Sequence, residues 1–210
     1  MVLLRKLIIF VVFAFAINLY SQQTSLLQTA NNALKSKNFE VAIQNFSKAI
    51  EINDKYAMSY YGRGVAYHHS ANYQQALLDF TKTISLDSTF IETYLSRSIT
   101  LTELGEYNKA MLDVTRYISK NPNSAEAYYT KANLFYYLEE DDSAIEEYTK
   151  AIKLNPNFGL AYYGRGVVYK LKGMKDLALK DFDKYLQVSG NMDNLEEETK
   201  RIIDEISKEE

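Results

Sequence analysis

The chain has 210 residues, no cysteine and a formal net charge of −3 at neutral pH. The missing cysteine excludes disulfide frameworks, thiolate metal sites, cysteine nucleophiles and the lipid-bearing cysteine of a bacterial lipoprotein. A mildly acidic chain gives no reason to expect nucleic acid as a partner.

The N-terminal segment, residues 1–21, has the layout of a secretory signal peptide. Arg5 and Lys6 form a short basic region, and residues 7–17 are apolar without a break. Spanning a membrane takes about 20 apolar residues, so this run is too short. Ser21 is a small residue suited to the position before the cut, although the site could shift by a residue or two. We expect residues 1–21 to be removed on export, with an uncleaved anchor as the alternative.

Beyond this leader, one motif returns at a fixed period. Tyr-Tyr-Gly-Arg-Gly-Val-Ala-Tyr at 60–67 recurs as Tyr-Tyr-Gly-Arg-Gly-Val-Val-Tyr at 162–169. Tyr94 and Tyr128 divide the distance between the two copies into three equal steps. A period of about 34 residues indicates stacked supersecondary units. It divides the chain into five units, residues 23–56, 57–90, 91–124, 125–158 and 159–192.

Each unit is predicted to contain two amphipathic helices joined by a short turn. In the second unit, Tyr60 and Gly64 are spaced for one face of the first helix. Asn-Pro-Asn at 121–123 and 155–157 separates one helix pair from the next, because proline cannot continue a helix. Ser124 is a suitable N-cap for the fourth unit.

Several columns, meaning the same position in successive units, keep one kind of side chain. A large residue early in the first helix is Leu26, Tyr60, Tyr94, Tyr128 and Tyr162. Four positions later a small residue follows, at Ala30, Gly64, Ser98, Ala132 and Gly166. The second helix carries an alanine at Ala42, Ala76, Ala110, Ala144 and Ala178. Four positions after that stand Phe46, Phe80, Val114, Tyr148 and Phe182. A closing proline is present at Pro122 and Pro156.

These columns resemble those of tetratricopeptide repeats, which are helix–turn–helix modules with the same period. The resemblance covers residues 23–192 and implies an all-α, right-handed solenoid. In such a stack, small residues let helices approach and aromatic residues fill the space between units. Residues 193–210 are predicted to form a capping helix with Glu196, Glu197 and Glu198 in its first turn. Its apolar stripe is Leu195, Ile202, Ile203 and Ile206.

The fourth unit departs from its neighbours at the turn between its helices. It reads Leu-Glu-Glu-Asp-Asp at 138–142, where the third unit has Gly105-Glu106-Tyr107. Glycine eases such a turn, and the aromatic residue packs beneath it. The loss of both predicts a looser corner with an acidic patch, either solvated or facing a basic partner.

Charged residues recur in two columns that change type together. Three units have arginine in the first helix and aspartate in the second, and the fourth unit has lysine and glutamate instead. The first unit has the uncharged Thr29 and Asn45. We expect structural ion pairs between the two helices of a unit, at Arg63–Asp79, Arg97–Asp113, Lys131–Glu147 and Arg165–Asp181. The pairing explains Gly-Arg-Gly without phosphate binding, because no strand precedes these glycines.

The family resemblance implies that the first helices line a concave groove for peptides or partner proteins. The residues expected to face it are Leu27, Asn31, Tyr61, Val65, His68, Leu95, Ile99, Tyr129, Asn133, Tyr136, Tyr163 and Val167. Aromatic residues make good interface anchors. We therefore expect Tyr61, Tyr129 and Tyr163 to bind the partner as a ladder, with packing between units as the alternative. The clamp that some family members use for a carboxyl-terminal tail is not visible, since Leu27 and Tyr61 stand where lysine would be expected.

No catalytic, metal or cofactor site is predicted. His68 and His69 are the only histidines, and as neighbours on a helix they point about 100° apart. No nucleophile elbow or zinc-protease motif occurs, and Ser70 lacks the context of a catalytic triad. We therefore expect no cofactor and no small-molecule substrate.

The sequence therefore predicts an exported, periplasmic, all-α solenoid of five repeats with a capping helix. Its predicted function is that of a non-catalytic scaffold or adaptor in the bacterial cell envelope, which holds a protein or peptide partner in the groove. A self-associating structural solenoid, and hence a homo-oligomer, is the alternative. An enzyme with an unrecognised site is the weakest hypothesis.

Overall fold

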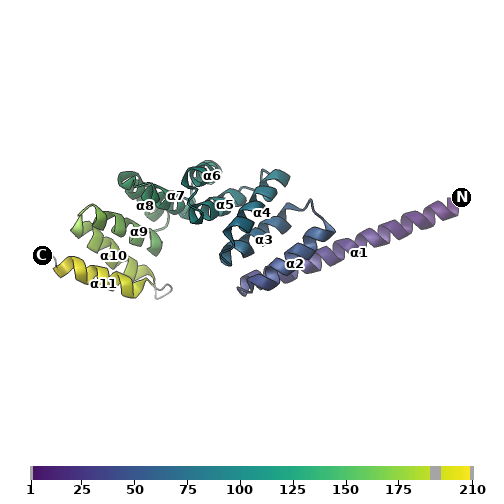
Figure 1. Ribbon diagram of the computed structural model, residues 1–210, viewed down its shortest axis with the longest axis horizontal. Helices are drawn as coiled ribbons and strands as arrows, with labels where there is room; N and C mark the ends of the chain where they lie inside the picture. Colours follow the sequence, from purple (N-terminus) through teal and green to yellow (C-terminus); the bar gives the residue numbers. More distant parts are fainter. Residues whose placement is uncertain (1, 190–194, 209–210) are drawn as a thin grey trace. The chain divides into compact units, whose positions relative to one another are not determined.

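The computed structural model describes residues 2–189 and 195–208, and these contain helices and no strand. The chain divides into two compact parts, each larger than a repeat, and these are called unit 1 (Met1 to Leu104) and unit 2 (Gly105 to Glu210) from here on. Unit 1 holds α1 (Val2–Lys35), α2 (Phe39–Ile52), α3 (Ala57–His69), α4 (Tyr73–Leu86) and α5 (Glu92–Glu103) (Figure 1). Unit 2 holds α6 (Tyr107–Lys120), α7 (Ala125–Tyr137), α8 (Asp141–Leu154), α9 (Gly159–Leu171), α10 (Lys175–Ser189) and α11 (Glu196–Lys208).

Within each unit, every helix packs against the next one along the chain. Alternate helices also touch: α1 contacts α3, α3 contacts α5, and α7 contacts α9. Within each unit, the first helices of successive pairs therefore lie side by side, and each is packed against the second helix that precedes or follows it in that unit. This arrangement confirms the predicted all-α array of helical repeats.

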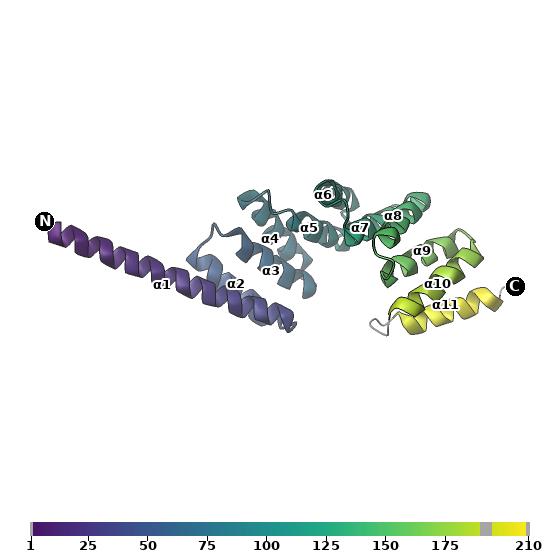
Figure 2. The same cartoon turned by 180° about the vertical axis from the view of Figure 1, so that it is seen from behind.

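The leader and the first helix of the first predicted unit form one continuous helix, α1. No glycine or proline interrupts residues 2–35, so nothing in the local sequence breaks the helix near Ser21. In both views its first part extends beyond α2 (Figures 1 and 2). From Ile8 to Lys35, α1 is long and apolar enough to cross a membrane, a test that signal sequences also pass.

The core is made of the small and aromatic columns. The alanine column of the second helices is fully buried, at Ala42, Ala76, Ala110, Ala144 and Ala178. The next large column of the same helices is at most 2% exposed, at Phe46, Phe80, Val114, Tyr148 and Phe182. A Cβ at Gly164 would lie 2.6 Å from Cζ of Tyr148 in the preceding pair, and one at Gly166 would lie 2.9 Å from Phe182 of its own pair. The two glycines of Gly-Arg-Gly therefore admit the aromatic rings of two successive helix pairs.

The turns between paired helices share one backbone conformation. Positive φ occurs once in each helix pair, at Lys37 (58°), Ala71 (59°), Gly105 (73°), Glu139 (60°) and Gly173 (69°). The N–H groups of Glu139 and Glu140 donate to the carbonyls of Tyr136 and Phe135 over 3.0 and 2.9 Å, and the turn at Gly173 makes the same two bonds over the same distances. This is the Schellman pattern of a helix C-terminus. The prediction of a looser turn in the fourth repeat is therefore wrong. Its hydrogen bonds hold Glu139 at the positive φ that Gly173 adopts in the next repeat.

The structure contains the N-cap expected at Ser124 and a terminal helix, α11, after the last repeat. The hydroxyl of Ser124 accepts a hydrogen bond from the N–H of Ala127 over 3.2 Å and caps α7. Helix α11 packs on α10 and buries Thr199 and Ile206, while Ile202 and Ile203 are half-buried. Of the predicted cap at 193–210, residues 193, 194, 209 and 210 lie outside the described range.

Candidate functional site: the grooves along the first helices

Two of the predicted ion pairs are bidentate. Arg63 donates through Nε and Nη2 to the two carboxylate oxygens of Asp79, over 2.7 and 2.8 Å. Arg165 and Asp181 are joined in the same way, over 2.7 and 2.9 Å. The hydrogen bond to Asp79 raises the pKa of Arg63. Each aspartate is about 5% exposed, so the arginine supplies the partner that a buried carboxylate requires.

The same arginines also connect successive helix pairs, which the sequence reasoning missed. Nη1 of Arg63 donates to Ser47 of the preceding pair over 3.0 Å, and Nη1 of Arg165 donates to Thr149 over 2.8 Å. Nη1 of Arg97 lies 3.3 Å from the hydroxyl of Thr81. The sequence does contain a sign of these contacts, because the accepting hydroxyl groups belong to one column of the second helices. That column is Ser47, Thr81, Thr115 and Thr149.

The remaining predicted pairs differ from this arrangement. Nζ of Lys131 lies 2.8 Å from Oε1 of Glu147, which also accepts from Lys150 over 3.4 Å. Oε2 of Glu147 is buried without a partner among the described residues. The pair of Arg97 and Asp113 is divided between the two units and stays a prediction.

The three tyrosines of the expected ladder pack against aromatic rings of the protein itself. Tyr61 contacts Phe80 and Phe90, with ring centroids 5.9 and 4.7 Å apart. In unit 2, Tyr129 contacts Tyr148 and Phe158 at 5.9 and 5.1 Å, and Tyr163 contacts Phe182 and Tyr185 at 5.9 and 5.4 Å. All three are half-buried. All of these rings belong to the tyrosine's own repeat, so the three tyrosines help to hold a repeat together and present only part of their surface to a partner.

The predicted groove residues of unit 1 fall into different environments. Leu27, Val65 and Ile99 are half-buried, and Asn31 is exposed. Leu95 is only 7% exposed, so the structure removes it from the expected binding surface.

His68 of the same unit is held within the protein. Its Nδ1 lies 3.0 Å from the hydroxyl of Thr100 on α5. Burial, followed by the neighbouring His69, lowers the pKa of His68 and favours the neutral ring. No group of three or more metal-ligating side chains is assembled among the described residues.

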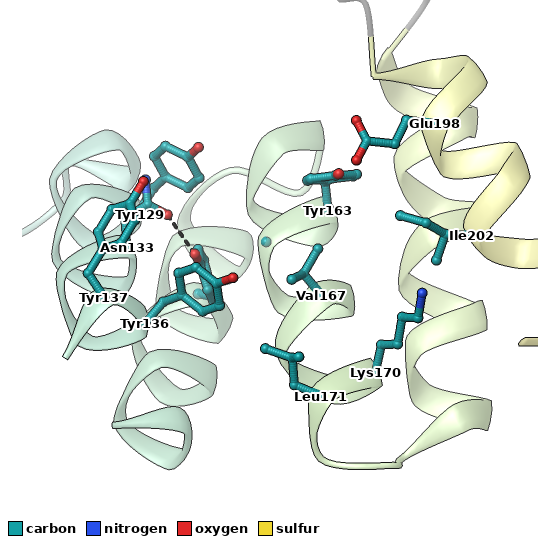
Figure 3. A pocket seen from close by; sticks show the side chains of 12 residues that line it. Tyr129, Asn133, Tyr136, Tyr137, Tyr163, Val167, Lys170, Leu171, Glu198 and Ile202 are labelled. Carbon is teal, nitrogen blue, oxygen red and sulfur yellow. Dashed lines mark hydrogen bonds between the residues drawn. The ribbon is translucent and has the colours of Figure 1, made fainter. Parts of the chain in front are cut away.

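Unit 2 contains an open groove with a volume of about 680 Å³ along α7, α9 and α11. All five residues predicted to face it from α7 and α9 line it, namely Tyr129, Asn133, Tyr136, Tyr163 and Val167 (Figure 3). Further lining comes from Tyr137, Tyr148, Gly164, Lys170, Leu171, Glu198 and Ile202. The sequence reasoning missed the wall from α11, because a helix expected only to cap the stack gave no reason to face the groove.

A polar group is fixed at the floor of this groove. Oδ1 of Asn133 accepts a hydrogen bond from the hydroxyl of Tyr148 over 2.5 Å. Burial raises the pKa of Tyr148, so its phenol keeps the proton that it donates. The Asn133 amide is thereby oriented with its oxygen occupied, and it offers its NH₂ group to a bound backbone carbonyl.

Two family models match the chain. One describes the tetratricopeptide repeat and matches residues 27–88, and the other describes the TPR repeat and matches residues 132–173. No curated protein matches the chain.

Several solved structures resemble the fold. A crystal structure of MamA is 27% identical, with a TM-score of 0.68, and the match covers 79% of this chain and 91% of MamA. MamA from Desulfovibrio magneticus RS-1 is 19% identical, with a TM-score of 0.73 over 82% of this chain and 98% of that one. YrrB, described as a TPR protein with an unusual peptide-binding site, is 23% identical, with a TM-score of 0.66 over 86% and 94% of the two chains.

Proposed function

Because the chain belongs to the tetratricopeptide repeat family, we propose that it is a non-catalytic scaffold that binds a protein or peptide partner in the bacterial cell envelope. The observation that carries this proposal is the groove of unit 2, which five residues predicted from the sequence line together. Its volume of about 680 Å³ lies in the usual range for ligand sites, and aromatic and aliphatic side chains make up most of its lining. YrrB supports the proposal as a protein of the same fold with a peptide-binding site.

The anchors that suit a partner best are side chains that line the groove from neighbouring first helices. Tyr136 is half-buried and forms part of the open groove wall, and Val167 lies across from it on α9 (Figure 3). Tyr129 and Tyr163 also line the groove and are themselves held by contacts with Phe158 and Tyr185. Such a rigid surface lowers the entropy lost on binding, because few side chains become ordered.

Export through removal of residues 1–21 is the second part of the proposal. The large apolar side chains from Ile8 to Ile17 are 54–69% exposed, and a soluble protein rarely keeps such a surface. Removal would shorten α1 to residues 22–35, which is close to the length of the other first helices, α3, α7 and α9. The intact mass of the protein recovered from the envelope tests this part, and a soluble cytoplasmic pool that keeps the leader would contradict it.

Capture of the partner tests the binding role. The wild-type chain and a Tyr136→Ser/Val167→Ser variant are crosslinked in the native envelope, and the captured proteins are identified and quantified. Leu112→Ser is the matched control, because Leu112 on α6 is 73% exposed and does not line the groove. We expect the double variant to lose roughly tenfold of its capture while the control keeps it. Equal capture by all three folded proteins would exclude the groove, and capture of the chain by itself would favour the self-associating solenoid.

A further inference from the structure

The groove of unit 2 presents aromatic faces that are fixed before a partner arrives. Five tyrosines line it: Tyr129, Tyr136, Tyr137, Tyr148 and Tyr163. Tyr137 is half exposed and stacks on Tyr107 with ring centroids 5.2 Å apart and planes 4° apart. The face of a tyrosine ring attracts an ammonium or guanidinium group as well as apolar side chains. The lining therefore suits both kinds of side chain.

The charges around these tyrosines are unbalanced. Glu198 on α11 points toward Tyr163 (Figure 3), and the described residues provide no cation within ion-pair distance of it. An adjoining hollow shares Tyr136, Tyr137 and Leu171 with the groove and is lined by two more carboxylates, Glu139 and Asp141. Neither of these carboxylates has an ion-pair partner in the described part of the chain.

The lysines near the groove do not offset these carboxylates, because each already has an acidic partner. Lys170 lies 3.1 Å from Glu205, and Lys172 lies 3.1 Å from Asp142. The uncompensated charge along the groove and the adjoining hollow is therefore negative.

We propose that the groove of unit 2 selects peptide segments in which lysine or arginine alternates with large apolar side chains. The apolar side chains lie on the tyrosines and on Val167 and Ile202. The cations reach Glu198 in the groove and the carboxylates of Glu139 and Asp141 in the adjoining hollow, with a tyrosine face beside each. Acidic segments are excluded, because like charges placed together cost binding free energy. This inference rests on the proposed peptide-binding function and adds the chemistry of the partner.

Three fluorescent peptides test the selection on the full chain without its leader. One alternates lysine with phenylalanine, the second replaces the lysines with glutamates, and the third replaces the phenylalanines with glycines. Fluorescence anisotropy gives each Kd at low and high salt. We expect the lysine–phenylalanine peptide to bind at least roughly tenfold more tightly than either relative, and to weaken with salt.

Two variants of α11 locate the interaction. Glu198→Lys reverses the charge that faces the groove, and Asp204→Lys makes the same change at an exposed position of α11 that does not line it. We expect Glu198→Lys to weaken the lysine–phenylalanine peptide roughly tenfold and Asp204→Lys to change it little. Helicity and melting are measured for both, so that loss of folding is not read as loss of binding.

Tyr136→Leu provides a second measurement that does not depend on α11. It keeps an apolar side chain and removes the aromatic face, so we expect weaker binding of the lysine–phenylalanine peptide. Equal binding of the glutamate peptide, or equal effects of Glu198→Lys and Asp204→Lys, would overturn the charge selection and leave the proposed peptide-binding function standing. Binding of none of the three peptides by the folded chain would overturn this inference, whereas failure of the capture experiment in the envelope would overturn the function itself.

Discussion

The pair α7–α8 and the pair α9–α10 have the same architecture but differ at the ion pair that joins their helices. In α9–α10, both oxygens of Asp181 accept from Arg165, which also reaches Thr149 of the preceding pair. In α7–α8, Glu147 uses one oxygen and keeps the other buried without a partner among the described residues. The two turns are nevertheless alike. Packing of the small and aromatic columns therefore sets the helix arrangement, and the ion pair adds stability to it.

Breaking the two ion pairs should give the largest difference between these helix pairs. Asp181→Ala removes the carboxylate that pairs with the half-buried guanidinium of Arg165, and we expect the free energy of unfolding to fall by about 2–3 kcal/mol. Glu147→Ala also removes the unpartnered oxygen and frees a lysine that can reach water, so we expect a loss of roughly 1 kcal/mol. Urea unfolding of the full chain, followed by helicity, compares them. Equal losses would show that the bidentate geometry carries no additional stability.

The space at the Gly-Arg-Gly motif gives the next largest effect. Gly164→Ala places a Cβ against the ring of Tyr148, whose hydroxyl is tied to Asn133, so the ring cannot move away freely. We expect a loss of about 2 kcal/mol, as for other overpacked cores. Gly159→Ala is the matched change at the start of α9, where the nearest atom to an added Cβ lies 3.4 Å away, and it should be milder. Thermal unfolding with the two variants side by side provides the check; an unchanged melting temperature for Gly164→Ala would mean that the packing adjusts.

Transferring the arginine–aspartate pair into α7–α8 tests whether the ion pair itself accounts for the difference in stability. Lys131→Arg combined with Glu147→Asp recreates the bidentate pair and supplies a partner for both carboxylate oxygens. We expect a gain of about 1 kcal/mol, because charge-assisted paired hydrogen bonds are stronger than a single contact. Lys131→Arg alone is the control, since the longer glutamate does not match the geometry of Asp181. A double variant no more stable than this control would assign the difference to the surroundings of α7–α8.

The smallest effect concerns the turn. Glu139→Gly relieves a positive φ of 60° in a residue with a Cβ, and we expect a gain of roughly 0.5–1 kcal/mol, reduced by the greater freedom of glycine in the unfolded chain. Gly173→Ala is the reverse change in α9–α10, where φ is 69° and no atom lies within 4 Å of an added Cβ. It should lower the melting temperature by a similar amount. If both variants lose stability, backbone strain is not the deciding factor.

Most of the fold could be read from the sequence because the repeat compares the chain with itself. Period, helix pairs, buried alanines and the residues of three ion pairs all followed from columns of identical spacing. The prediction failed at Glu139. Composition suggested a loose turn there, but hydrogen bonds between backbone groups impose the same turn as in the other repeats. Hydrogen bonds of this kind are independent of side-chain type, so no single residue could reveal them.

For the candidate site as well, some features followed from the sequence and others only from the tertiary structure. The family resemblance implied which columns of the first helices face a groove, and the helical period keeps each column on one face. Packing between helices then buried Leu95, engaged Tyr61, Tyr129 and Tyr163 in aromatic contacts within their own repeats, and brought Glu198 and Ile202 to the groove. The reason is that local periodicity fixes a direction from the helix axis, whereas burial and the walls of a groove depend on which other helices approach that face.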